Sequence, residues 1–147
     1  MNDNNSLPVS VAASIIYRKT QIWKDVHYLK TDLTSAQIPV LLTVCRKDGI
    51  TQNELVEQLI MDKSTVAKLV GKLVESGYLL RSANARDKRA YDLLPSSKAI
   101  TMYPRLLEIG VAWDNTLIKG MSAEEVEIFK RLLTLATQNA IEYSKEN

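Results

Sequence analysis

Residues 51–77 hold two short helix patterns separated by a break of only a few residues, and this arrangement restricts the fold more than any other feature of the chain. Thr51 and Glu54 have the spacing of a capping box, which predicts a helix that starts directly after Thr51. A second helix is predicted to begin at Asp62, as its N-cap, and to stop at Gly77. Two short helices joined by so tight a turn are typical of a helix-turn-helix.

The second of these helices has one apolar face and one polar face. Its apolar residues recur at the spacing of a core-facing helix and are Val66, Leu69, Val70, Leu73 and Val74. Its polar face carries Lys63, Ser64, Thr65, Lys68 and Lys72. Hydroxyl groups in the first turn, followed by a ridge of lysines, suit a recognition helix that enters the major groove of DNA. An ordinary solvated face has a similar composition, so the DNA interpretation depends on the neighbouring elements.

A basic hairpin is predicted immediately after this helix. Residues 78–83 and 90–94 have the composition of strands, and the turn between them carries Arg86, Asp87, Lys88 and Arg89. Residues 62–90 contain seven basic and three acidic residues, a net charge of +4, whereas the whole chain carries only +2. A hairpin tip is often charged simply because it is exposed to solvent. This local excess of positive charge beside a lysine ridge favours contact with a polyanion.

Long helices are predicted on both sides of this central module. Their expected ranges are 7–31, 34–47, 96–119 and 122–143, with capping boxes at Thr34–Gln37 and Ser122–Glu125 and with Ser96 as a cap. The outer helices carry more apolar side chains than the small module can cover, so they are expected to pack on a second copy of the chain. The predicted fold is mainly α with a small β-hairpin wing. It comprises a winged helix-turn-helix at 33–99 and a helical dimerisation region at 1–32 and 100–147.

The chain resembles the MarR family of bacterial transcription regulators over residues 33–98. The resemblance rests on "LTSAQIPVLLTV" at 33–44, on "TQNELVEQLIMDKSTVAKLVGKLVESGYLLR" at 51–81, and on Asp87-Lys88-Arg89. It implies a homodimer whose recognition helices read a pseudo-palindromic operator in double-stranded DNA. It also implies that Arg89 reaches the minor groove, that Arg86 and Lys88 contact flanking phosphates, and that Asp87 braces the wing.

The same resemblance implies a repressor that a small lipophilic or phenolic effector releases from DNA. Candidate pocket residues are Tyr17, Trp23, Tyr28 and Trp113, each of which is also consistent with a core or interface position. Cys45 follows an apolar run near the end of a predicted helix. It is therefore expected to be a buried structural thiol rather than a redox sensor, although Arg46 and Lys47 beside it favour the thiolate.

Other classes of function find little support in the sequence. The chain lacks the glycine-rich phosphate-binding motifs and the G-x-S-x-G nucleophile motif, so an enzyme is not expected. One histidine and one cysteine cannot form a zinc site, and no metal or cofactor is expected. No apolar run approaches the length of a membrane span and no signal peptide is visible, which favours a cytoplasmic protein. The main alternative is a winged-helix module that binds a protein instead of DNA.

Overall fold

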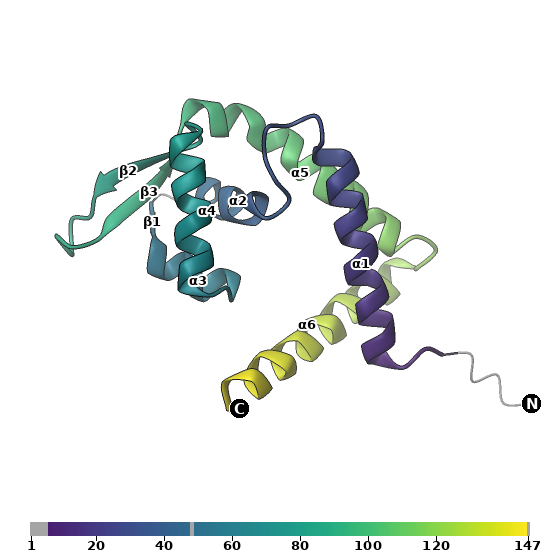
Figure 1. The fold of residues 1–147 in the computed structure, drawn as a ribbon. Coiled ribbons are helices and arrows are strands. Elements are labelled where there is room, and N and C mark those ends of the chain that lie inside the picture. The colour runs from purple at the N-terminus through teal and green to yellow at the C-terminus, as the bar shows by residue number, and fades with distance from the viewer. Residues whose placement is uncertain (1–5, 48, 147) are drawn as a thin grey trace, which may run out of the picture. The chain divides into compact units, whose positions relative to one another are not determined.

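The computed structural model describes residues 6–47 and 49–146, and its architecture is mainly α with a small antiparallel sheet (Figure 1). In chain order the elements are α1 (Val9–Tyr28), α2 (Gln37–Cys45), β1 (Ile50–Thr51), α3 (Gln52–Leu59), α4 (Lys63–Glu75), β2 (Leu79–Ala83), β3 (Tyr91–Pro95), α5 (Ser97–Leu117) and α6 (Ala123–Glu146). The predicted fold class and the order of its helices are confirmed. The chain forms two compact units that meet within α5, between Gly110 and Val111.

The core of the first unit is built mainly from α2, α4 and the strands. The inward face of α4 is buried as its apolar spacing predicts, at Val66, Leu69, Val70 and Leu73. Opposite it, α2 buries Ile38, Val40, Leu41 and Val44, and Tyr78 and Leu93 are buried from the wing. Each of the larger side chains stabilises the fold by about 1.5 to 3 kcal/mol through burial. The polar face of α4 is consequently turned outward to solvent.

The sheet has the strand order β1-β3-β2, with both neighbouring pairs antiparallel. The wing hairpin was predicted, and its register places Arg81 opposite Leu93. β1 was not predicted, because two residues are too few to show an alternating pattern. It exists because Ile50 pairs with Leu93 from the other side, which ties the start of α3 to the base of the wing.

The capping boxes are confirmed at two of the three predicted positions. The Glu54 backbone N–H donates to the Thr51 hydroxyl, while Glu54 Oε2 accepts from the Thr51 N–H at 2.7 Å. Ser122 and Glu125 form the same reciprocal pair. At Thr34 only half of the predicted box forms: Gln37 Oε1 accepts from the Thr34 backbone N–H at 2.8 Å, but α2 begins at Gln37 and the Thr34 hydroxyl donates to the Gln37 side chain instead of accepting from a backbone N–H.

Each helix of the helix-turn-helix ends at a residue with positive φ, Ile60 after α3 and Gly77 after α4. Ile60 ends α3 in the left-handed conformation, at φ 52° and ψ 47°. This backbone turns the Ile60 side chain outward and leaves it 59% exposed. Gly77, at φ 77°, ends α4, as predicted.

The second unit contains the last turns of α5 and the whole of α6. Its apolar residues Val111, Leu117, Phe129 and Leu133 line a hollow of about 370 Å³. Several large apolar side chains of this unit are exposed to solvent, namely Val111, Ile128, Leu132, Leu133 and Leu135. None of the helices in the described part of the chain combines the length and hydropathy that a membrane span requires.

Candidate nucleic-acid interface

The first turn of α4 is organised by the carboxylate of Asp62. Asp62 Oδ1 accepts from the Thr65 backbone N–H at 2.8 Å and from the Ser64 hydroxyl at 2.7 Å, and Oδ2 accepts from the Thr65 hydroxyl at 2.5 Å. These bonds, the Thr65 hydroxyl first, hold the pKa of Asp62 far below its usual range. A hydroxyl has a single proton to donate. Ser64 and Thr65 are therefore left with lone pairs only, and toward an external group they act as acceptors.

The outward face of α4 carries three lysines and several small residues. Lys63, Lys68 and Lys72 are exposed, as is Ser64, whereas Thr65 is half-buried. Ala67 is also exposed, and a Cβ added at Gly71 would meet no atom within 4 Å. The sequence analysis did not single out these two small positions. They leave the helix backbone accessible between the lysines, so that a partner can approach it closely.

The tip of the wing is held by a set of short side-chain-to-backbone hydrogen bonds. Asn84 Oδ1 accepts from the backbone N–H groups of Arg86 and Asp87, at 2.9 and 2.8 Å. Asp87 Oδ1 in turn accepts from the Arg89 N–H at 2.9 Å, and the Asn84 amide donates to Asp92. Asp87 thus contacts the backbone of the turn that presents Arg89. Asn84 was missed in the sequence analysis, although an asparagine two residues before the tip is the signal of an Asx turn.

A basic groove of about 480 Å³ lies between the start of α3, the first residue of α4 and the wing. Three cationic residues line it, Lys63, Arg81 and Arg89, together with one acidic residue, Asp87. Arg81 was not named as a contact residue in the sequence analysis. Strand alternation offered no signal for it, because Arg81 is two residues from the buried Leu79 and would share its face, yet Arg81 is exposed.

A second hollow, of about 430 Å³, gives Arg86 a different environment. It is lined by Glu54, Asn84, Arg86 and Asp92, among others. The pKa of Glu54 is lowered, first by the hydrogen bonds from Thr51 and to a smaller extent by the nearby charge of Arg86. Acidic groups therefore partly neutralise Arg86, whereas Arg81 and Arg89 share a groove whose four charged residues include three cations.

Three of the four aromatic residues named for an effector pocket, Tyr17, Trp23 and Tyr28, lie on α1 in different environments. Tyr28 is buried and lines a cavity of about 340 Å³ with Lys24, Leu33 and Thr34, and this burial raises the pKa of its hydroxyl. Tyr17 is exposed on α1, and Trp23 stacks on the His27 ring with a centroid separation of 3.4 Å. Trp113 belongs to the second unit.

Two other sequence expectations concern cysteine and metal chemistry. Cys45 is a half-buried free thiol, and burial raises its pKa, so the neighbouring Arg46 and Lys47 do not activate it. Within residues 6–47 and 49–146, no group of three His, Cys, Asp or Glu side chains is placed to hold a metal ion.

Comparison with known proteins finds similarity to one family of regulators. The model of the MarR family matches residues 31–90, which span α2, the helix-turn-helix and most of the wing. Over these residues the chain is similar to the MarR family of transcriptional regulators. The chain is 26% identical over 125 residues to the uncharacterized HTH-type transcriptional regulator YybA of Bacillus subtilis, and the match covers 85% of this chain and 83% of YybA. It is 29% identical over 102 residues to the transcriptional regulator HosA of Escherichia coli, covering 69% and 76% of the two chains.

Solved MarR-family structures show the same fold. A MarR transcriptional regulator from Methanosarcina mazei superposes with a TM-score of 0.82 at 27% identity, over 92% of this chain and 97% of that one. A putative MarR family regulator from Listeria monocytogenes, solved in complex with 26mer DNA, superposes with a TM-score of 0.88 at 21% identity, over 97% of both chains. The family and these relatives are regulators and not enzymes.

Proposed function

We propose that this protein is a homodimeric MarR-family regulator that binds a pseudo-palindromic operator in double-stranded DNA and represses transcription until a small lipophilic or phenolic effector binds. The observation that carries the proposal is the basic groove lined by Lys63, Arg81 and Arg89, which begins at the same end of α4 as its exposed lysine face. A polyanion that contacts the wing therefore also contacts α4. The Listeria regulator of the same fold was solved with DNA, which supports this choice of polyanion.

Each part of the surface is assigned a role by its chemistry. Lys68 and Lys72 contribute salt-sensitive affinity for phosphates, while Ala67 and Gly71 let the backbone of α4 come close to base edges. Ser64 and Thr65, whose protons are bound to Asp62, accept from the amino groups of cytosine or adenine and do not donate to phosphates. These two hydroxyl groups therefore contribute to DNA sequence specificity through contacts with bases.

The arginines of the wing are assigned different contacts with DNA. Arg89, on a turn fixed by Asp87, is the group that reaches the minor groove. Lys88 is exposed and contacts a flanking phosphate. Arg86 makes a weaker phosphate contact than Arg81, because Glu54 and Asp92 share its hollow.

Exposed apolar surface at the ends of the chain supports the dimer. α1 exposes Val9, Val11, Ile16, Ile22 and Val26, and α6 exposes Ile128, Leu132, Leu133 and Leu135. Apolar surface of this extent is characteristic of an interface, and a second copy of the chain supplies a matching one. A two-fold dimer predicts half-sites about one helical turn apart, ~10 bp from centre to centre.

The effector part of the proposal rests on the cavity at the end of α1. Its volume of about 340 Å³ is within the range of small-ligand sites, and its lining combines the Tyr28 ring with the opposite charges of Lys24 and Asp25. Lys24 is the group with which an aromatic anion would pair. Addition of such a compound to the protein–DNA complex is expected to release the duplex, and a panel of phenolic acids identifies the ligand.

The central experiment selects duplexes from a random pool with the purified protein and then measures affinity by fluorescence anisotropy at several salt concentrations. Arg89→Ala is expected to weaken operator binding by ~1 to 3 kcal/mol while light scattering still reports a dimer. Arg105→Ala, a change at an exposed arginine of α5 outside the groove, serves as the matched control. A monomeric mass near 16.5 kDa, or a pool without enriched duplexes, would contradict the proposal and favour a protein-binding module.

A further inference from the structure

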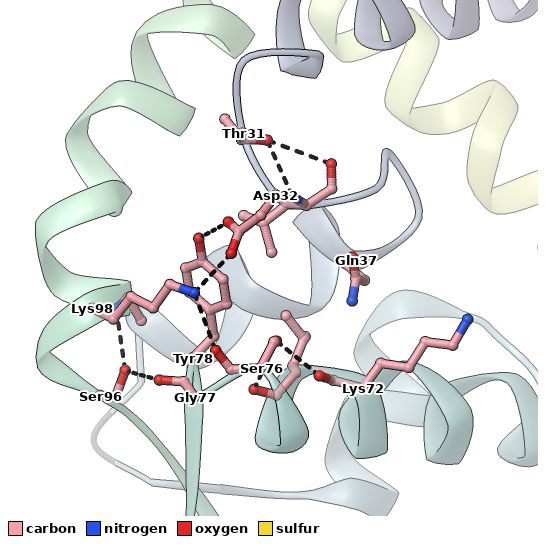
Figure 2. A network of polar contacts seen from close by, with 12 residues as sticks. Thr31, Asp32, Gln37, Lys72, Ser76, Gly77, Tyr78, Ser96 and Lys98 are labelled. Carbon is pink, nitrogen blue, oxygen red and sulfur yellow. Dashed lines mark hydrogen bonds and ion pairs between the residues drawn. The ribbon is translucent and has the colours of Figure 1, made fainter.

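Three side chains that are far apart in the sequence meet beside the C-terminal end of α4 (Figure 2). Asp32 lies between α1 and α2, Tyr78 lies just after α4, and Lys98 lies in the first turn of α5. One carboxylate oxygen of Asp32 accepts from the Tyr78 hydroxyl, and the other accepts from Lys98 Nζ at 2.7 Å. The same Nζ lies 4.0 Å from the centre of the Tyr78 ring and donates to the Ser76 carbonyl at 3.1 Å.

The burial of the three side chains indicates which of these contacts fixes their arrangement. The exposed fraction of Tyr78 is 0%, so its hydroxyl depends on a partner inside the protein. The side chains of Asp32 and Lys98 are 56% and 45% exposed, and an ion pair so open to water is weak by itself. The bond between the Tyr78 hydroxyl and the Asp32 carboxylate is therefore the most directional contact, and Lys98 orients the carboxylate that accepts it.

The protonation states that this bond requires are stable at neutral pH. The hydrogen bond from Lys98, followed by that from Tyr78, lowers the pKa of Asp32, so the carboxylate stays ionised. Burial, followed by the bond to Asp32, raises the pKa of the Tyr78 hydroxyl, so it stays protonated. Neither group titrates in the physiological range, and the contact is a permanent part of the folded unit.

Ser96 makes a second connection between the end of α4 and the start of α5. Its hydroxyl donates to the Gly77 carbonyl at 2.6 Å and accepts from the Ala99 N–H at 3.2 Å. Its backbone N–H donates to the Tyr78 carbonyl at 2.9 Å. The C-terminal end of α4 is thus bonded to the first turn of α5 through main chain as well as side chains.

We propose that Asp32, Tyr78 and Lys98 form a positioning lock that fixes α4 on the first turn of α5 and on the segment after α1, and so sets the spacing between half-sites that the dimer accepts. The inference rests on the proposed function. α5 continues from Lys98 beyond Gly110 into the second unit, which carries exposed apolar surface. Any movement of these three side chains therefore changes how each α4 is held relative to α5, the helix that leads to the proposed dimer interface.

The lock is tested with Tyr78→Phe, which removes the hydroxyl and keeps the ring. The probes are the duplex selected by the wild-type protein and two versions whose half-sites are one base pair closer or farther apart. The wild type is expected to discriminate strongly among the three. Tyr78→Phe is expected to bind the selected duplex about five- to tenfold more weakly, the size of a typical coupling between sites. It is also expected to discriminate less between the three spacings.

Two further variants separate positioning from simple loss of stability. Ile38→Val removes one methyl group from the buried face of α2, outside the lock, and is expected to lower the melting temperature while leaving spacing discrimination unchanged. Lys98→Met, at a partly exposed position, keeps the fold and is expected to reproduce the loss of discrimination, and Lys98→Arg is expected to restore it.

The outcomes distinguish the lock from the function on which it rests. Wild-type spacing discrimination in Tyr78→Phe and Lys98→Met would overturn the lock and leave operator binding intact. The same loss of discrimination in Ile38→Val would overturn it as well, because destabilisation alone would then explain the effect. If the wild-type protein enriches no duplex, the proposed function itself fails and the lock with it.

Discussion

Replacing glycine by alanine at two positions of the same helix is predicted to change stability in opposite directions. Gly71 lies inside α4, whereas Gly77 lies just beyond its end with φ at 77°. The Gly77 N–H donates to the Val74 carbonyl at 3.0 Å, and the Tyr78 N–H donates to the Leu73 carbonyl at 2.8 Å. This pair of bonds is a Schellman motif, which requires the left-handed backbone at Gly77.

The expected change in stability for each variant follows from the backbone conformation alone. A Cβ added at either glycine would meet no atom within 4 Å, so neither change creates a clash. Gly71→Ala is expected to stabilise the fold by about 0.5 to 1 kcal/mol, since alanine suits a helix interior better than glycine. Gly77→Ala places an alanine in the left-handed backbone conformation, which lowers the stability of the folded state by about 1 to 2 kcal/mol. Both changes restrict the unfolded chain equally, so this left-handed cost is also the expected difference between the two variants.

Urea unfolding followed by far-UV circular dichroism measures this difference, at one fixed protein concentration because a dimer's stability depends on concentration. Gly110→Ala in α5, where an added Cβ also meets nothing within 4 Å, is a third variant expected to follow Gly71→Ala. If Gly71→Ala and Gly77→Ala shift the midpoint in the same direction, the assignment of the Schellman motif as the end of α4 is refuted.

Three other predictions concern charge and reactivity. Arg81→Ala is expected to reduce the slope of log K against log salt by about 0.9, the value for one phosphate contact; an unchanged slope, as expected for the Arg105→Ala control, would remove Arg81 from the interface. The folded-state pKa values of Asp32 and Glu54 are lowered. Their contribution to stability is therefore present above the unfolded values of about 4 and is lost as pH falls through the lower folded values. Melting temperatures measured from pH 7 to pH 2 check this sign, and a melting temperature that rises on acidification would contradict it. Because burial raises the pKa of Cys45, its thiol is expected to react with an aromatic disulfide reagent at pH 8 more slowly than free glutathione, and an equal rate would show an activated thiol.

Much of the candidate interface was predictable because it depends on short-range patterns. The lysines of α4 follow from helical spacing, and the arginines of the wing follow from their place between two strand patterns. The sequence did not reveal that the Ser64 and Thr65 hydroxyls both donate to Asp62, since that depends on side-chain rotamers. Nor did it reveal that Arg81 joins Lys63 and Arg89 in one groove, because those residues lie on three different elements.

Local chemistry in the sequence determined where most helices begin and end and which face of α4 is buried. Caps such as Thr51 with Glu54, and the apolar spacing of α4, involve residues within a few positions of one another, so they act before any tertiary contact forms. Tertiary structure alone decided the pairing of β1 with β3 and the outward turn of Ile60. It also decided the meeting of Asp32 with Tyr78 and Lys98, across 46 and 66 positions. Partners so distant in sequence are brought together by burial of the whole core, for which no local pattern exists.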